Sequence, residues 1–237
     1  MRKTQQLILT PLFLLILLAL SAARADTVED SGIWIAAFGQ GSLEIINPKL
    51  QKYRWWFDTH ARYRDAGGQF YQGIVRPGLG YSLTGNTAVW LGYAWITTSP
   101  VGGEDFDEHR IWQQLTWSTR LDPVTLSTRS RLEQRFLETG DDTGWRFRQL
   151  LQLQYPFSFE PRLSLVGYDE LFIHLNSTDW GADSGFDQNR LFAGFGWNFD
   201  TDRRITGAIG YLNQFTRKPS GDNEMNHILS IYLLLNF

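Results

Sequence analysis

The sequence predicts an all-β protein: a transmembrane, antiparallel, up-and-down β-barrel of about 10 to 12 strands, with short periplasmic turns and longer extracellular loops. Three observations predict this fold. The N-terminus has the pattern of a secretory signal, long runs of alternating apolar and polar residues follow it, and the last strand ends on Phe237. Together they indicate a secreted chain that crosses a membrane with strands.

The N-terminus predicts a signal peptide over residues 1–25. Met1 to Lys3 form a basic start, residues 7–20 are apolar, and Ala23 to Ala25 fit a small-x-small cleavage site. The apolar segment is shorter than the ~20 residues that a spanning helix needs, which argues against the alternative of a retained anchor. The mature chain, residues 26–237, then forms one outer-membrane barrel domain.

Charge and composition exclude several classes of protein. Arg2, Lys3 and Arg24 account for three of the 22 basic residues, so the mature chain keeps 19 against 25 acidic residues, a net charge of −6. This balance argues against a nucleic-acid partner. Because the chain has no cysteine, a disulfide framework and a thiolate metal site are excluded. We expect no metal and no cofactor.

Alternation with a period of two residues recurs along the mature chain. Residues 53–63 and 145–155, for example, place aromatic and aliphatic side chains on one face and Arg, Asp, His or Gln on the other. Runs of this length suit tilted strands that cross a bilayer, whereas strands of a soluble β-sandwich or lipocalin-like barrel, the alternative folds, are typically about 5 to 6 residues long. The last run, 226–237, resembles the C-terminal signal by which the barrel assembly machinery recognises outer-membrane proteins.

The connections between runs predict the topology. We expect ten strands, at 51–65, 70–83, 86–98, 107–121, 124–138, 143–157, 161–176, 186–200, 203–216 and 225–237. Short and longer connections alternate, which predicts periplasmic turns, external loops and both chain ends in the periplasm. Residues 32–45 are also strand-like and form either a hairpin, which gives twelve strands, or a segment inside the barrel. Residues 166–172 would turn Asp169 or Glu170 outward, which predicts a bulge there.

The charged face of each strand must line the interior, because an arginine that faces lipid at the bilayer midplane costs about 2 to 4 kcal/mol. The candidate ligand-binding residues of this wall are Arg110, Gln114, Arg129, Arg131, Glu133, Arg135, Arg146, Arg148, Glu170, Arg190, Gln214 and Asn226. Arg54, Arg62, Arg64, Arg76, Arg120, Asp58 and Glu108 are also expected to face inward. Further acids are expected in the external loops: Glu104, Asp105, Asp107, Asp141, Asp142, Asp179, Asp183, Asp187, Asp222 and Glu224.

This arrangement is compatible with three functions, of which we favour the first. The arginines and carboxylates could pair internally, in a structural or surface-binding barrel whose acidic loops contact outer-membrane lipid and lipopolysaccharide. An arginine ladder could instead pass an anionic small solute or an acidic oligosaccharide. A lipid-modifying hydrolase is the second alternative, but His227 and Ser230 fall on opposite faces and Asp58 and His60 lack a serine, so we predict no catalytic residue and lean against an enzyme.

Eight short motifs resemble one bacterial family. They are RPGLGY (76–81), WLGYAW (90–95), FDEHRIWQQL (106–115), RSRLEQRF (129–136), YDELF (168–172), FDQNR (186–190), GYLNQF (210–215) and NHIL (226–229). They are similar to the outer-membrane family catalogued as domain of unknown function 2490, over nearly all of the mature chain. The resemblance implies a porin-like outer-membrane β-barrel of a Gram-negative bacterium and carries over no catalytic residue, ligand or oligomeric state.

Overall fold

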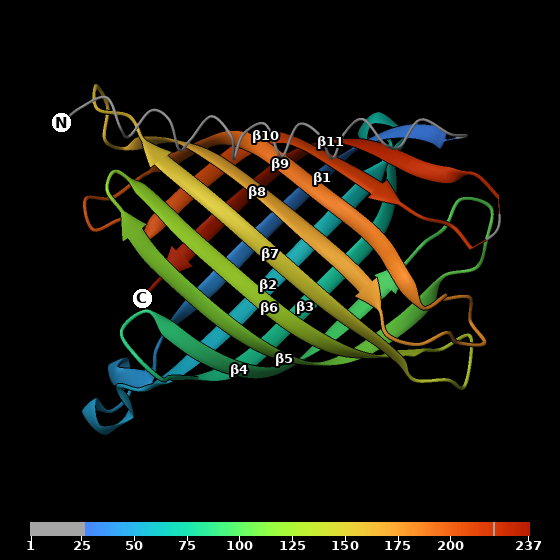
Figure 1. Ribbon diagram of the computed structural model, residues 1–237, viewed down its shortest axis with the longest axis horizontal. Coiled ribbons are helices and arrows are strands. Elements are labelled where there is room, and N and C mark those ends of the chain that lie inside the picture. Colours follow the sequence, from blue (N-terminus) through green and yellow to red (C-terminus); the bar gives the residue numbers. More distant parts are fainter. Residues whose placement is uncertain (1–26, 220) are drawn as a thin grey trace.

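The computed structural model describes residues 27–219 and 221–237, so the predicted signal peptide lies outside the described residues. Within them, eleven strands close into one barrel, and each strand pairs with its neighbours in the sequence. The strands cross the barrel obliquely (Figure 1). Their bounds are β1 Thr27–Ser42, β2 Tyr53–Arg64, β3 Gln69–Ser82, β4 Thr87–Thr98, β5 Phe106–Leu121, β6 Val124–Leu137, β7 Gly144–Pro156, β8 Leu163–His174, β9 Gly185–Asn198, β10 Ile205–Thr216 and β11 Asn223–Asn236.

The ten strands predicted from alternation correspond to β2–β11, and the prediction of an all-β barrel is confirmed. Alternation located them because a barrel wall sends successive side chains to opposite faces. In β9, for instance, buried and more exposed positions alternate from Gln188 to Asn198.

The predicted closure of the barrel is wrong. Residues 32–45 form neither a hairpin nor an internal segment, because most of them belong to β1, a single wall strand. β1 pairs with β2 antiparallel and with β11 parallel, from Thr27 opposite Asn223 to Gln40 opposite Asn236. A parallel ladder satisfies the backbone groups of both strands, so an odd strand number leaves no open edge. The barrel is therefore mixed, and its first strand begins at the end opposite the C-terminus (Figure 1).

The two ends of the barrel differ, and we call them the turn end and the loop end. The turn end carries the connections at 83–86, 122–123, 157–162 and 199–204, the 3-10 helices η2 (Leu43–Ile45) and η3 (Pro48–Leu50), and Phe237. The loop end carries the connections at 65–68 with η4 (Asp65–Gly67), 99–105, 138–143, 175–184 and 217–222 (Figure 1). The ten predicted strands, β2 to β11, begin and end at the turn end as expected, but β1 precedes them and starts at the loop end, opposite Phe237.

The expected bulge lies close to its predicted place but not at it. β8 runs regularly through Asp169 and Glu170, and the pairing with β9 shifts between Phe172 and Ile173. Glu170 is buried in the interior, whereas Asp169 faces outward and accepts a hydrogen bond from Asn189 Nδ2 at 2.9 Å. No bulge forms at Asp169, because its carboxylate stays on the outward face of a regular strand and is hydrogen-bonded to the next strand.

Tryptophan rings fill part of the interior beside β2 to β5. Trp90 and Trp112 are buried in one apolar cluster, with Trp56 packed against it. They fit because the facing positions have no side chain: a Cβ on Gly80 would meet the Trp90 ring, and a Cβ on Gly78 would meet the Trp112 ring. Glycine in these strands therefore serves close packing of aromatic rings inside the barrel.

Candidate binding site in the barrel interior

The twelve candidate residues all lie in the barrel interior. Nine are buried, and Arg129, Arg135 and Gln214 are partly buried. Gln214 stands opposite Arg190 on one side and Asn226 on the other, and Arg131 Nε donates to Gln114 Oε1 at 2.8 Å. All twelve side chains thus lie on the inward face of their strands.

Glu133 on β6 is the centre of the charged network. Its side chain is fully buried, and its two oxygens accept hydrogen bonds from Arg148 Nη1 at 2.7 Å and Arg146 Nη2 at 2.8 Å. Two further guanidinium groups approach it, Arg110 at 3.7 Å and Arg131 at 3.8 Å. One carboxylate is therefore shared by four arginines, and hydrogen bonds to a charged group of this kind are about twice as strong as neutral ones.

Glu108 extends the network toward the loop end. Arg110 binds it with two hydrogen bonds, of 2.6 and 2.7 Å, and Arg135 Nε donates to it at 2.5 Å. Arg135 Nη1 also lies 2.9 Å from His174 Nε2. A bidentate contact orients the planar guanidinium as well as neutralising it, so these side chains are held in one geometry.

Asp187 and Glu170 complete the network on β8 and β9. Asp187 Oδ2 accepts from Arg146 Nη1 at 3.1 Å, and Glu170 Oε1 accepts from Arg148 Nη2 at 2.7 Å and from Arg129 Nη2 at 2.8 Å. The chain of contacts thus runs across five neighbouring strands, from β5 to β9. On the facing wall, Asp58 of β2 pairs separately with Arg76 of β3 at 3.0 Å.

The arginine network and the tryptophan cluster meet at Arg131. Its guanidinium lies 4.6 Å from the centre of the Trp112 ring and 5.9 Å from that of Trp56. A guanidinium over an aromatic face is attracted by the ring quadrupole, more strongly where both are desolvated. The charged network on β5 to β9 and the tryptophan cluster beside β2 to β5 are therefore in direct contact.

Two buried arginines, Arg62 and Arg190, differ from the others. Within the described residues, neither forms an ion pair with a carboxylate; Arg62 donates to Gln72 Oε1 at 2.7 Å, and Arg190 donates no side-chain hydrogen bond. Both instead lie over the ring of Trp34 on β1, at 4.0 Å and 4.9 Å from its centre. Arg190 stands opposite Glu170 in the pairing of β8 with β9 but forms no ion pair with it, so within the described residues both buried arginines beside Trp34 lack a direct carboxylate partner.

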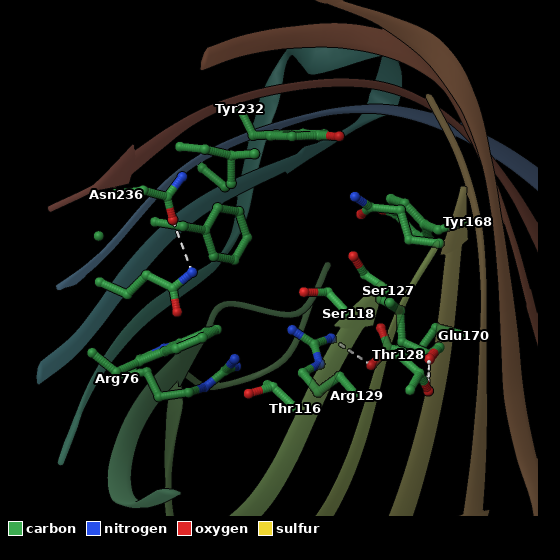
Figure 2. A pocket seen from close by; sticks show the side chains of 18 of the residues that line it. Arg76, Thr116, Ser118, Ser127, Thr128, Arg129, Tyr168, Glu170, Tyr232 and Asn236 are labelled. Carbon is green, nitrogen blue, oxygen red and sulfur yellow. Dashed lines mark hydrogen bonds and ion pairs between the residues drawn. The ribbon is translucent and has the colours of Figure 1, made fainter. Parts of the chain in front are cut away.

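Two cavities approach this pair of arginines from opposite ends. A cavity of about 430 Å³ lies in the half of the interior near the turn end, and one of about 230 Å³ lies near the loop end. Trp34, Arg62, Arg76, Arg148 and Arg190 line both. In the larger cavity, Tyr232 and Asn236 face Arg76, Thr116 and Arg129 across an open space (Figure 2).

The loops at 138–143 and 175–184 interlock above the charged network. Asp179 accepts hydrogen bonds from the backbone N–H groups of Asp141 at 2.9 Å and Asp142 at 3.2 Å, and Trp180 Nε1 donates to Asp142 O at 2.9 Å. The backbone donors hold the pKa of the Asp179 carboxyl below its ordinary value. The Trp180 ring lies over Arg135 at 4.9 Å, so the loop pair packs onto the interior network.

Several acids expected in the loops lie elsewhere. Asp107, Asp187 and Glu224 belong to strands, and Glu224 pairs with Arg64 at 3.3 Å and with Lys218 at 3.0 Å. In the part of the chain that the structure describes, no three His, Cys, Asp or Glu side chains gather as a metal site would require. Nor is any described helix long and apolar enough to cross a membrane.

Sequence reasoning missed three residues of this interior. Asp187 stands at the β8–β9 bulge, where a residue drops out of the pairing, so a period of two could not reveal that it reaches Arg146. His174, which lies 2.9 Å from Arg135 Nη1 and 3.4 Å from Asp187 Oδ2, was not among the predicted site residues. Trp34 lies in the segment whose placement the sequence left undecided, although its alternation with Ile33 and Ile35 was a usable signal for an inward ring.

The histidines of the described residues have partners other than serine. His60 lies 3.4 Å from Asp58, but within the described residues no serine hydroxyl forms a hydrogen bond with a histidine ring. His227 is on the outer surface, where it meets the Tyr211 hydroxyl at 2.6 Å, while Ser230 is buried. An acyl-transfer mechanism needs nucleophile and base within hydrogen-bond reach, and this arrangement is not present there.

A closed β-barrel whose interior is packed with paired arginines and carboxylates is the class that the fold and this site define. The chain belongs to the family described as protein of unknown function (DUF2490), whose model matches residues 31–226. It is 32% identical over 217 residues to an uncharacterised protein of Methylorubrum extorquens, with 91% of each chain covered. No solved structure matches the chain. The resemblance inferred from its motifs is thereby confirmed.

Proposed function

We propose that the protein is a bacterial outer-membrane β-barrel whose interior is closed to free diffusion, with a structural or surface-binding role. The outer surface supports insertion into a membrane, because every strand exposes large apolar side chains. Examples from β1 to β11 are Ile35, Phe57, Leu79, Leu91, Ile111, Phe136, Leu151, Leu165, Phe195, Ile209 and Leu229. A soluble protein rarely exposes so extensive an apolar surface, and a closed barrel leaves no backbone group unpaired in lipid.

The difference between the two ends supports an orientation. Outer-membrane barrels have short periplasmic turns and longer external loops, so the loop end would face outward. In this orientation Phe237 lies on the periplasmic side, where the barrel assembly machinery would meet the last strand, and the start of β1 lies at the cell surface. The exposed acids of the loops, among them Glu104, Asp141 and Asp183, would then lie at the level of lipopolysaccharide.

Cysteine labelling tests this orientation, because the natural chain has no cysteine. Val101 in an outer loop and Phe159 in a turn are both exposed, so Val101→Cys and Phe159→Cys form a matched pair. In intact cells, a membrane-impermeant maleimide should label Val101→Cys alone, and after permeabilisation of the outer membrane it should label both. Labelling of Phe159→Cys alone would reverse the orientation, and equal labelling of both in intact cells would argue against insertion.

The observation that carries the closed state is the Glu133 cluster, with four guanidinium groups around one buried carboxylate. It is backed by the tryptophan rings on the facing wall and by the interlocked loops above it. We expect the purified protein to give no steady conductance in a planar bilayer. A steady current would contradict the closed state.

An anion channel is the second candidate, and one observation favours it. Seven arginines but four carboxylates are buried among the described residues: Arg62, Arg76, Arg110, Arg131, Arg146, Arg148 and Arg190 against Asp58, Glu108, Glu133 and Glu170. Rings of arginine favour negative solutes in pores. If the bilayer does show a current, it should select anions, and Arg131→Glu should reduce that selectivity. A lipid A mass profile that changes with the protein would instead support a hydrolase.

A further inference from the structure

We propose that Arg62 and Arg190, on either side of the β1–β11 closure, together with Trp34 form a binding site for an amphiphilic anion. The ligand would have a carboxylate or phosphate-monoester head held by the two arginines and an apolar body that occupies the larger cavity. This site goes beyond the proposed function, because binding at it needs no conductance and no contact with the loops.

The first support is the distribution of charge. Five of the seven buried arginines, namely Arg76, Arg110, Arg131, Arg146 and Arg148, pair with carboxylates. The three positive charges in excess of the four buried carboxylates therefore concentrate on the remaining two arginines and on the crowded cluster beside them. A buried charge without a partner is strongly unfavourable, so an anion at this place would be stabilised by pairing with these arginines.

The second support is unused hydrogen-bonding capacity. Arg62 Nε and Arg190 Nε are buried and have no hydrogen-bond partner in the described residues. A guanidinium offers five N–H donors, and Arg62 uses one, toward Gln72, while Arg190 uses none in hydrogen bonds. Planar forks of this type match the two oxygens of a carboxylate or phosphate. Arg62 and Arg190 both lie within 5 Å of the centre of the Trp34 ring and both line the same two cavities, so the site offers both guanidinium groups to a ligand there.

The third support is the chemistry of the cavity below the arginines. Its volume of about 430 Å³ falls in the range of about 300 to 1,000 Å³ that is typical of ligand pockets. Its lining includes apolar and aromatic side chains such as Phe38, Trp56, Leu150, Tyr168 and Tyr232. The smaller cavity on the other side is lined by more charged groups, including Glu108, Arg135 and Asp187. The apolar body of the anion would therefore lie in the larger cavity, on the turn-end side of the two arginines.

Titration calorimetry of the purified barrel in an uncharged detergent tests the proposal. The probes are phenyl phosphate, hexanoate, inorganic phosphate and benzyl alcohol. We expect phenyl phosphate or hexanoate to bind, inorganic phosphate to bind more weakly because it lacks the apolar body, and benzyl alcohol to bind most weakly because it lacks the charge. The relative affinities of phenyl phosphate and hexanoate show whether the site prefers a phosphate monoester or a fatty-acid-like carboxylate.

Arg190→Gln and Arg62→Gln should each weaken binding of the anionic probe about tenfold or more, the effect of losing hydrogen bonds to a charged group. Arg190→Lys keeps the charge but loses the fork, so it should fall between Arg190→Gln and the natural chain. The matched control is Arg120→Gln, at an arginine that is 64% exposed at the turn end, and it should bind like the natural chain.

Each variant is first checked for the heat-resistant, compact mobility of a folded barrel on gel electrophoresis. Absence of binding by every anionic probe, or equal affinity in folded Arg190→Gln and the natural protein, would overturn the site. The bilayer experiment is independent: a conducting barrel that binds no anion at Arg190 rejects this site and the closed state together, whereas a silent barrel that binds phenyl phosphate supports both.

Discussion

The half of the interior near the loop end and the half near the turn end are filled by different chemistry. Near the loop end, Glu108, Glu133 and Asp187 are cross-linked by arginines, and the remaining cavity is small. Near the turn end, Tyr168 stacks on Phe192 with ring centres 4.9 Å apart, and the larger cavity stays open. The same wall of strands therefore supports one region whose order depends on charge pairing and another whose order depends on packing.

The barrel interior is therefore demanding about sequence near the loop end and more tolerant near the turn end. An ion-pair cluster tolerates little change, because the loss of one partner leaves the others buried and uncompensated. Aromatic and aliphatic side chains exchange more freely if their volume is conserved. We therefore expect the region near the loop end to be sensitive to single substitutions and the region near the turn end to accommodate them, as a cavity that admits a ligand must.

The largest effect is expected for Glu133→Gln. This change removes the negative charge shared by Arg110, Arg131, Arg146 and Arg148, and breaking a buried pair in this way costs about 3 to 5 kcal/mol. Urea unfolding in lipid vesicles, followed by tryptophan fluorescence, measures the change in the free energy of unfolding. Glu104→Gln, in an exposed loop, is the control and should change it by less than about 0.5 kcal/mol. Equal stability of the two variants would show that the cluster is not what orders this region.

A smaller effect is expected for Phe192→Leu near the turn end. Phe192 is 1% exposed and also packs against Tyr232, with ring centres 5.7 Å apart. Leucine keeps the site apolar but is smaller than phenylalanine and loses the ring contacts, so the free energy of unfolding should fall by about 1 to 2 kcal/mol, less than for a broken buried ion pair. The same unfolding assay applies. A loss as large as that of Glu133→Gln would remove the contrast between the two regions.

The smallest effect is expected for the two interlocked loops, 138–143 and 175–184, whose contact should weaken at low pH. The pKa of Asp179 is lowered in the folded protein, so its contribution is present above about pH 3.9, the ordinary value for Asp, and is lost as the pH falls through the lowered value. Amide hydrogen exchange of residues 138–143, corrected for the intrinsic rate, should therefore accelerate in acid.

Asp179→Asn should show the faster exchange already at neutral pH, because the neutral amide accepts weaker hydrogen bonds from Asp141 and Asp142. The exposed Asp183 provides the control: Asp183→Asn should exchange like the natural chain. In both variants the free energy of unfolding of the barrel should stay unchanged. Exchange that is independent of pH in the natural protein would show that Asp179 does not hold the two loops together.

Much of the polar wall could be predicted because its members lie on regular strands. Arg129, Arg131 and Arg135 follow one another at even spacing, so any barrel would send all three inward. Their partners could not be predicted in the same way, since Arg129 binds Glu170, 41 residues away, and Arg135 binds Glu108, 27 residues away. Asp187 was beyond prediction for another reason, because a bulge suspends the alternation at that position.

Local periodicity determined the all-β class, the positions of β2 to β11 and the faces of their side chains, because a strand imposes a period of two wherever one side meets a different environment from the other. Tertiary structure alone decided the closure through β1 and which buried arginines pair with carboxylates. It also decided that, within the described residues, Arg62 and Arg190 form no ion pair with one. These depend on register between strands that are distant in sequence: Trp34 meets Arg190 only because β1 lies parallel to β11.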